Sequence, residues 1–138
     1  MLAFVSEVHW LAVLAASVAH FMLGGAWFMG LVPKHYQAAL GRNDPPGAKP
    51  PALVIIGPAL CSLVIITTTA MLLKALAIVT YGDAIAFGAF VALGYLAPMV
   101  MVIAINPNFP RPFYYAAINA PYFVLGSILS CVILTAMS

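Results

Sequence analysis

The sequence predicts an all-α membrane protein in which four antiparallel transmembrane helices form a compact bundle. Hydrophobic residues make up 65% of the 138 residues and charged residues only 6%, whereas soluble domains carry about a quarter of their residues as charges. Four long apolar segments alternate with short polar breaks, and short breaks join antiparallel neighbours. We therefore expect a single domain over residues 1–138, with spans near 9–32, 53–78, 84–105 and 113–137.

The first span, residues 9–32, carries the ionisable side chain His20 in the middle of an apolar run. At about 1.5 Å per residue, a helix of this length crosses the roughly 30 Å hydrocarbon core of a bilayer. Gly24 and Trp27 follow His20 at i+4 and i+7, so the three residues share one helix face. We expect Gly24 and Gly25 to allow another helix to approach closely.

A polar, proline-rich segment follows, residues 33–51, and it is expected to lie at the membrane surface with one helical turn at residues 36–40. The second span ends near Lys74, whose long side chain can extend its ammonium to the interface. The break around residues 81–83 is so short that the second and third spans are predicted to form a tight helical hairpin.

Small and polar side chains mark the packing faces of the last two spans. The third span carries Gly88, Gly94 and Tyr95. On the fourth span, a stripe of polar and small residues recurs at helical spacing and is expected to face protein rather than lipid. Its members are Asn119, Tyr122, Gly126 and Ser130.

Predicted depth in the membrane suggests partners for the buried polar groups. His20 and Tyr95 are expected at similar depth, so Tyr95 is the proposed hydrogen-bond partner of the imidazole. Trp27 and Asn119 are also expected at similar depth, which allows a hydrogen bond from the indole to the amide. For each of these residues a structural role is favoured over a chemical one, although an intramembrane ionisable residue is always a functional hypothesis.

The few basic residues predict an orientation. Lys34, Arg42, Lys49 and Arg111 lie in breaks on one side of such a four-span chain, and only Lys74 lies toward the other. Because loops rich in Lys and Arg stay in the cytoplasm, both termini are expected to be extracytoplasmic.

Several function classes lack their residues here. No Asp or Glu lies inside any span, whereas an exporter that exchanges cations for protons needs such a carboxylate. The three histidines cannot provide the four ligands of two bis-histidine haems. No metal-ligand spacing, phosphate-binding loop or nucleophile motif is present, and a net charge of +2 does not indicate nucleic acid. We therefore expect no enzyme activity and no cofactor.

The chain resembles a bacterial membrane family known as domain of unknown function 1761. The resemblance rests on Trp10-Leu11-Ala12-Val13, on Gly24-Gly25-Ala26-Trp27, and on Arg111-Pro112 followed by Asn119-Ala120-Pro121-Tyr122. The sequence departs from the family where His9 replaces an Asn, where Met29-Gly30 replaces Ser-Pro, and where His20 replaces an apolar residue. The resemblance implies a small four-helix protein of the bacterial cytoplasmic (inner) membrane and brings no known activity.

Two function hypotheses remain from these observations. The first is a non-enzymatic helical module that acts by lateral association, either as a homo-oligomer or as an accessory subunit of a larger membrane complex. The alternative is a small-solute or ion transporter or channel that is formed by an oligomer and lined by His20, Tyr95 and Asn119.

Overall fold

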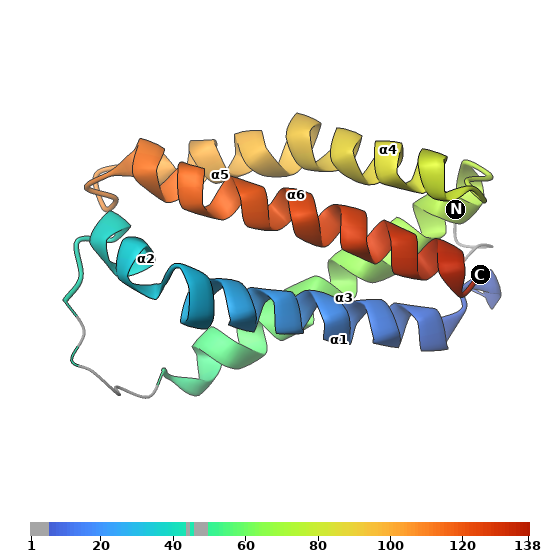
Figure 1. Cartoon of the computed structure of the whole chain (residues 1–138), viewed down its shortest axis with the longest axis horizontal. Coiled ribbons are helices and arrows are strands. Elements are labelled where there is room, and N and C mark those ends of the chain that lie inside the picture. The colour runs from blue at the N-terminus through green and yellow to red at the C-terminus, as the bar shows by residue number, and fades with distance from the viewer. Residues whose placement is uncertain (1–5, 44, 46–49) are drawn as a thin grey trace.

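The computed structural model describes residues 6–43, 45 and 50–138, and every regular element among them is helical. The predicted all-helical fold is thereby confirmed (Figure 1). In chain order the elements are α1 (Trp10–Gly25), η2 (Ala26–Leu31), α2 (Pro33–Ala39), α3 (Ala52–Ala75), α4 (Tyr81–Val91), η3 (Ala92–Leu96), α5 (Ala97–Ala104) and α6 (Pro112–Ala136).

Four continuous helical stretches are long and apolar enough to cross a membrane, with mean hydropathy between 1.7 and 2.2. Each end lies within about three residues of its predicted position. Consecutive stretches run in opposite directions, and the beginning of α1 lies at the same end of the bundle as the end of α6 (Figure 1). The four stretches are Trp10–Leu31, Ala52–Ala75, Tyr81–Ala104 and Pro112–Ala136.

Helix α6 is the central element of the bundle. It packs against α1, against α4 with its continuation η3 and α5, and against α3. Within an apolar stretch of 18 residues in each helix, 39% of the residues are buried in α6, compared with 11% in α3. Its inward face carries small residues such as Ala116, Gly126 and Ser130, which let neighbouring backbones approach closely.

The predicted hairpin between the second and third spans is wrong. Helix α3 packs on α1 and on α6 and runs obliquely across them, while α4 packs on α6 instead (Figure 1). At the end of α3 the backbone N–H of Ile78 donates to the carbonyl of Leu73 at 2.9 Å, and that of Ala77 donates to Lys74 at 3.0 Å. This cap places Ala77 in the left-handed region at φ 52° and redirects the chain. A short connection brings the ends of two helices together but does not require the helices to pack side by side along their lengths.

Two spans contain a wider π-helical turn. In η2 the N–H of Val32 donates to the carbonyl of Trp27 at 2.9 Å, and after η3 the N–H of Ala97 donates to Ala92. Both bonds join residues five apart instead of four. A proline follows Val32 and another follows Ala97, and each lacks the N–H that would donate to the carbonyl four residues earlier, so a wider turn lies directly before each of these two prolines.

Helix α2 is a short surface helix at the end of the bundle opposite the start of α1 and the end of α6 (Figure 1). It covers seven residues where a single turn at residues 36–40 was expected, because Pro33 fits the first turn of a helix and starts it earlier. A hydrogen bond of 2.6 Å between His35 Nδ1 and the Tyr114 hydroxyl joins α2 to α6. A polar contact therefore joins α2 to α6 at this end of the bundle.

Candidate functional site

The side chain of His20 is buried between α1 and α6, with an exposed fraction of 5%. Its Nδ1 lies 3.2 Å from the Ser130 hydroxyl oxygen, and that hydroxyl donates to the carbonyl of Gly126 at 2.8 Å. A serine hydroxyl has one proton, and the bond to Gly126 uses it, so we infer that the imidazole is the donor to Ser130 and carries a proton on Nδ1.

Gly126 provides the space in which the His20 ring lies. A Cβ atom at this position would stand 2.6 Å from His20 Cε1, which is far inside van der Waals contact. The ring of Tyr122 packs edge-on to the imidazole with a centroid distance of 5.4 Å. Three members of the stripe predicted on the fourth span, Tyr122, Gly126 and Ser130, thus contact the histidine of the first span.

Tyr95 does not contact His20, so the predicted pair is wrong. Its side chain is 66% exposed on the outer surface of η3. Tyr95 lies within the π-helical turn, which rotates its residues away from the α-helical register used for the prediction. The expected packing roles of Gly94 and Gly25 are also wrong within this chain, because no atom lies within 4 Å of a Cβ at either position.

The Trp27 indole does reach α6, but its acceptor is not the predicted amide. Its Nε1–H donates to the backbone carbonyl of Ile118 at 3.1 Å. The side-chain amide of Asn119 donates instead to the carbonyl of Tyr115, one turn earlier in the same helix, at 2.8 Å. An asparagine that finds an acceptor in its own helix has less need of a partner on another one.

Glycine contacts set the spacing of two helix pairs. A Cβ at Gly24 would meet the Tyr122 hydroxyl oxygen at 3.1 Å, where α1 approaches α6. A Cβ at Gly88 would meet Ile128 Cα at 3.0 Å, where α4 approaches α6. The Ser127 hydroxyl also donates to the Gly88 carbonyl at 2.9 Å. Close backbone approach and a hydrogen bond therefore coincide at the α4 and α6 contact.

An aromatic run continues from Tyr122 toward the α2 end of the bundle. Successive ring centroids are 5.1 Å apart for Tyr122 and Phe28, 4.9 Å for Phe28 and Tyr36, and 5.9 Å for Tyr36 and Tyr115. Sequence reasoning missed this run because its members come from three different elements and have no common spacing. Such rings fill the end of a bundle and are favoured at the membrane interface.

The polar groups inside the spans form pairwise contacts between helices rather than one shared cavity. Among the residues that the structure describes, no three His, Cys, Asp or Glu side chains come close enough to hold a metal ion. His20 and Trp27 form hydrogen bonds with Ser130 and with the Ile118 carbonyl, at two different places on α6. At a third place, Ser127 of α6 donates to the Gly88 carbonyl of α4. The arrangement can hold neighbouring helices in register.

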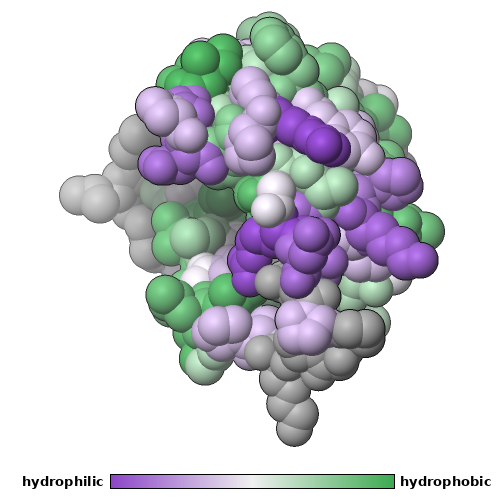
Figure 2. All heavy atoms as spheres, turned by 90° about the vertical axis from the view of Figure 1, so that its left-hand side faces the viewer, coloured by the Kyte–Doolittle hydropathy of each residue, from purple (hydrophilic) through white to green (hydrophobic). Residues whose placement is uncertain are grey.

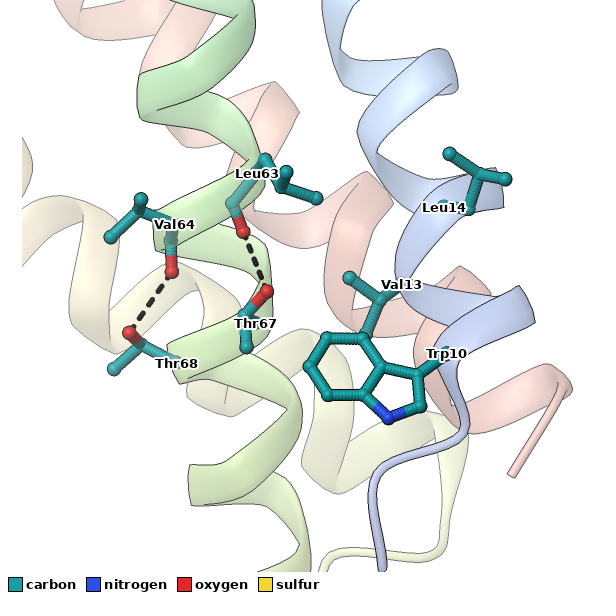
Figure 3. A pocket seen from close by; sticks show the side chains of 7 residues that line it. All are labelled: Trp10, Val13, Leu14, Leu63, Val64, Thr67 and Thr68. Carbon is teal, nitrogen blue, oxygen red and sulfur yellow. Dashed lines mark hydrogen bonds between the residues drawn. The ribbon is translucent and has the colours of Figure 1, made fainter. Parts of the chain in front are cut away.

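An open groove of about 450 Å³ lies between α1 and α3 on the outer surface of the bundle, and Figure 3 shows the side chains that line it. Two of its threonine hydroxyls turn back to their own helix, since Thr67 donates to the Leu63 carbonyl at 2.8 Å and Thr68 to the Val64 carbonyl at 3.0 Å. The groove surface is therefore almost wholly apolar. It is lined by Trp10, Val13, Leu14, Leu63, Val64, Thr67 and Thr68. We call it the α1/α3 groove.

Charged residues lie at the two ends of the bundle. Lys34, Arg42 and Arg111 belong to α2 and to the segments that follow α2 and precede α6, and Figure 2 shows hydrophilic residues gathered on this end. Lys49, which also entered the predicted orientation, lies outside the described residues. At the opposite end, Lys74 Nζ lies 3.9 Å from Glu7 Oε2.

Comparison with known proteins identifies a family and no activity. A family model described as a protein of unknown function, DUF1761, matches residues 11–135, which is nearly the whole chain. No curated protein and no solved structure matches the chain.

Proposed function

The chain belongs to the DUF1761 family of unknown function, and we propose that it is a non-enzymatic module that acts by lateral association with a second copy of itself in the membrane. The observation that carries this proposal is the α1/α3 groove. This apolar groove lies beside α3, most of whose residues are not buried by other helices. A ridge of side chains from another helix fits a groove of this kind.

The burial of α3 supports an interface on this side. Of the 24 residues of α3, only Ser62, Ile66 and Leu73 are buried. Lipid tails are as apolar as leucine side chains, so hydrophobicity alone does not cover such a helix. Association in a membrane comes instead from van der Waals fit, and a grooved surface offers a second helix more contact than it offers a mobile lipid chain.

The alternative of a solute or ion pathway gains no support from the geometry. His20 and Asn119 are buried in helix contacts, whereas Tyr95 is exposed on η3, so the three side chains do not line one cavity. An accessory-subunit role differs from self-association only in the identity of the partner, and the experiment below separates the two.

The test is the dimerisation equilibrium in large liposomes, measured by single-molecule photobleaching at a series of protein-to-lipid ratios. Thr67→Trp fills the α1/α3 groove, and Ile65→Trp is its matched control, because residue 65 lies on the same helix but outside the groove. We expect the wild type and the control to dimerise alike, and Thr67→Trp to dimerise at least about ten-fold more weakly, a loss of about 1.4 kcal/mol.

Two results would overturn the proposal. The first is a wild type that stays monomeric in liposomes at all protein-to-lipid ratios. If this protein also co-purifies with other proteins from gently extracted native membrane, the accessory-subunit role replaces self-association. The second is equal dimerisation of Thr67→Trp and Ile65→Trp, which would place the interface elsewhere.

We also propose that the α2 end of the bundle faces the cytoplasm of a bacterial cell, with both termini outside. Lys34, Arg42 and Arg111 at this end, against Lys74 at the other, support the orientation. Single cysteines at Lys34 and Tyr81 test it with a membrane-impermeant maleimide. Cells should be labelled at residue 81 while intact and at residue 34 only after lysis, and the reverse pattern would refute the orientation.

A further inference from the structure

The Tyr95 hydroxyl lies deep in the third span without a hydrogen-bond partner. This spanning stretch runs from Tyr81 to Ala104, so its nearer end is nine residues away from Tyr95, or about 14 Å. A helical side chain leans toward the N-terminus of its helix, which here is toward the middle of the bilayer. The side chain is mostly exposed, and its hydroxyl bonds to no residue that the structure describes. In hydrocarbon, an unpaired hydroxyl lowers stability.

A backbone carbonyl two positions earlier lacks its helical hydrogen bond. The Leu93 carbonyl would accept from residue 97 in an α-helical turn or from residue 98 in a π-helical turn. The N–H of Ala97 donates to Ala92 instead, and Pro98 has no N–H. The π-helical turn therefore leaves an acceptor at Leu93 close to the unpaired donor of Tyr95.

The surface around these two groups is open and large enough for an interface. We call the side of α4, η3 and α5 that lies opposite their buried residues the η3 face. Five of its side chains are 57% to 69% exposed, namely Phe90, Leu93, Tyr95, Met99 and Val102. If a large side chain has about 150 to 250 Å² of surface, these five present roughly 600 Å². A standard stable interface buries about 800 Å² per partner, so the area of the η3 face approaches that of a stable contact.

We propose that the η3 face binds a second copy of this chain, with the Tyr95 hydroxyl of each copy donating to the Leu93 carbonyl of the other. Lipid acyl chains have neither donors nor acceptors, whereas a second copy has both. Copies in one membrane share an orientation, so the two-fold axis between them lies along the membrane normal and equal residues lie at equal depth. Residues 93 and 95 differ in depth by only about 3 Å, so the two bonds can form together.

Gly94 lies between the two polar groups and allows the close approach that these bonds need. It is exposed, and no atom of the chain lies within 4 Å of a Cβ placed there. Small residues at such positions let the backbones of two membrane helices come near each other. The donor, the acceptor and the glycine occupy consecutive positions, 93 to 95, which is the arrangement that a self-complementary contact requires.

This contact is separate from the one proposed for the α1/α3 groove. Helix α6 lies between α1 and the stretch of α4, η3 and α5 (Figure 1), and the two surfaces share no residue. Pairs that form through the groove can therefore associate further through the η3 face.

The experiment measures association of the full chain in large liposomes by single-molecule photobleaching, with Thr67→Trp as the parent because its groove is filled. Tyr95→Phe removes the hydroxyl and keeps the ring, and Tyr81→Phe is its matched control at the end of the same spanning stretch. The parent should still associate at high protein-to-lipid ratios. Adding Tyr95→Phe should weaken this association about ten-fold, because each pair loses two hydrogen bonds, and adding Tyr81→Phe should not change it.

A second pair of variants tests the close approach. Gly94→Leu places a large side chain between the two backbones, so in the same parent it should also weaken association at least about ten-fold. Gly25→Leu is the matched control, because Gly25 is an equally open glycine that lies on α1. Tyr95→Phe alone should unfold in micelles as the wild type does, since the hydroxyl has no partner within the described chain.

Three results would overturn the proposal. The first is a Thr67→Trp parent that is monomeric at every ratio, and the second is equal association after Tyr95→Phe and Tyr81→Phe. The third is unchanged self-association when Tyr95→Phe releases a co-purifying protein from native membrane, which would assign the η3 face to another protein. Failure of the groove contact gives a different result, because Thr67→Trp and Ile65→Trp would then associate equally while Tyr95→Phe still weakened association.

Discussion

Replacing Gly126 by alanine should destabilise the bundle by displacing the His20 ring. The added methyl would stand 2.6 Å from His20 Cε1 and 3.0 Å from Nδ1. A ring at the end of a side chain can often move aside, but this one is only 5% exposed and packs edge-on against Tyr122. A shift of the ring also disturbs the 3.2 Å contact between Nδ1 and the Ser130 hydroxyl.

The expected loss combines two effects. Adding a methyl group to a well-packed interface typically lowers stability by about 1 to 3 kcal/mol, and a buried hydrogen bond contributes about 1 kcal/mol. We therefore expect Gly126→Ala to lower the free energy of unfolding by about 2 to 4 kcal/mol. Gly94→Ala is the control, because a Cβ at Gly94 has no atom within 4 Å and alanine is at least as favourable as glycine in a helix.

Reversible unfolding in mixed micelles, followed by circular dichroism, measures both variants. A double-mutant cycle with His20→Ala isolates the contact, since Gly126→Ala should be much less harmful once the imidazole is gone. The nitrogen chemical shifts of His20 should report a proton on Nδ1 in the wild type. The reasoning is refuted if Gly126→Ala unfolds at the same detergent fraction as Gly94→Ala, or if the cycle shows no coupling.

Three further variants probe other contacts by the same unfolding measurement. Ala77→Gly should stabilise the protein by about 1 kcal/mol, because residue 77 has φ 52° and glycine adopts the left-handed region without strain; an unchanged midpoint would contradict this. Gly88→Ala should destabilise it by about 1 to 3 kcal/mol, because the new methyl would meet the Ile128 backbone at 3.0 Å and backbone moves less readily than a side chain. Stability equal to that of the wild type would show instead that α4 can move away from α6. Trp27→Phe keeps an aromatic ring but removes the donor to Ile118, so a loss of about 1 kcal/mol is expected, and no loss would mean that the indole bond adds nothing to stability.

The amino-acid sequence determined the number of spans and their approximate ends. Long apolar runs must become helices in lipid, because every backbone N–H and carbonyl needs a partner within the chain. Residues with local roles were also predictable. The hydroxyls of Thr67 and Thr68 donate to carbonyls in their own helix, and such contacts depend only on neighbours in sequence. The polar and small character of residues 119–130 indicated the buried face of α6.

Only the tertiary structure decided which polar groups meet. His20 pairs with Ser130 instead of Tyr95, and Trp27 bonds to a backbone carbonyl instead of the Asn119 amide. In a soluble protein the polar face of a helix shows which side is outside, but here apolar residues predominate on both the lipid-facing and the protein-facing sides. Apart from the polar stripe of α6, the sequence pattern therefore carries little information about helix rotation, and π-helical turns such as the one at Tyr95 change that rotation further. Which faces of these helices touch is decided by the fit of side chains between them, and that fit exists only in the folded bundle.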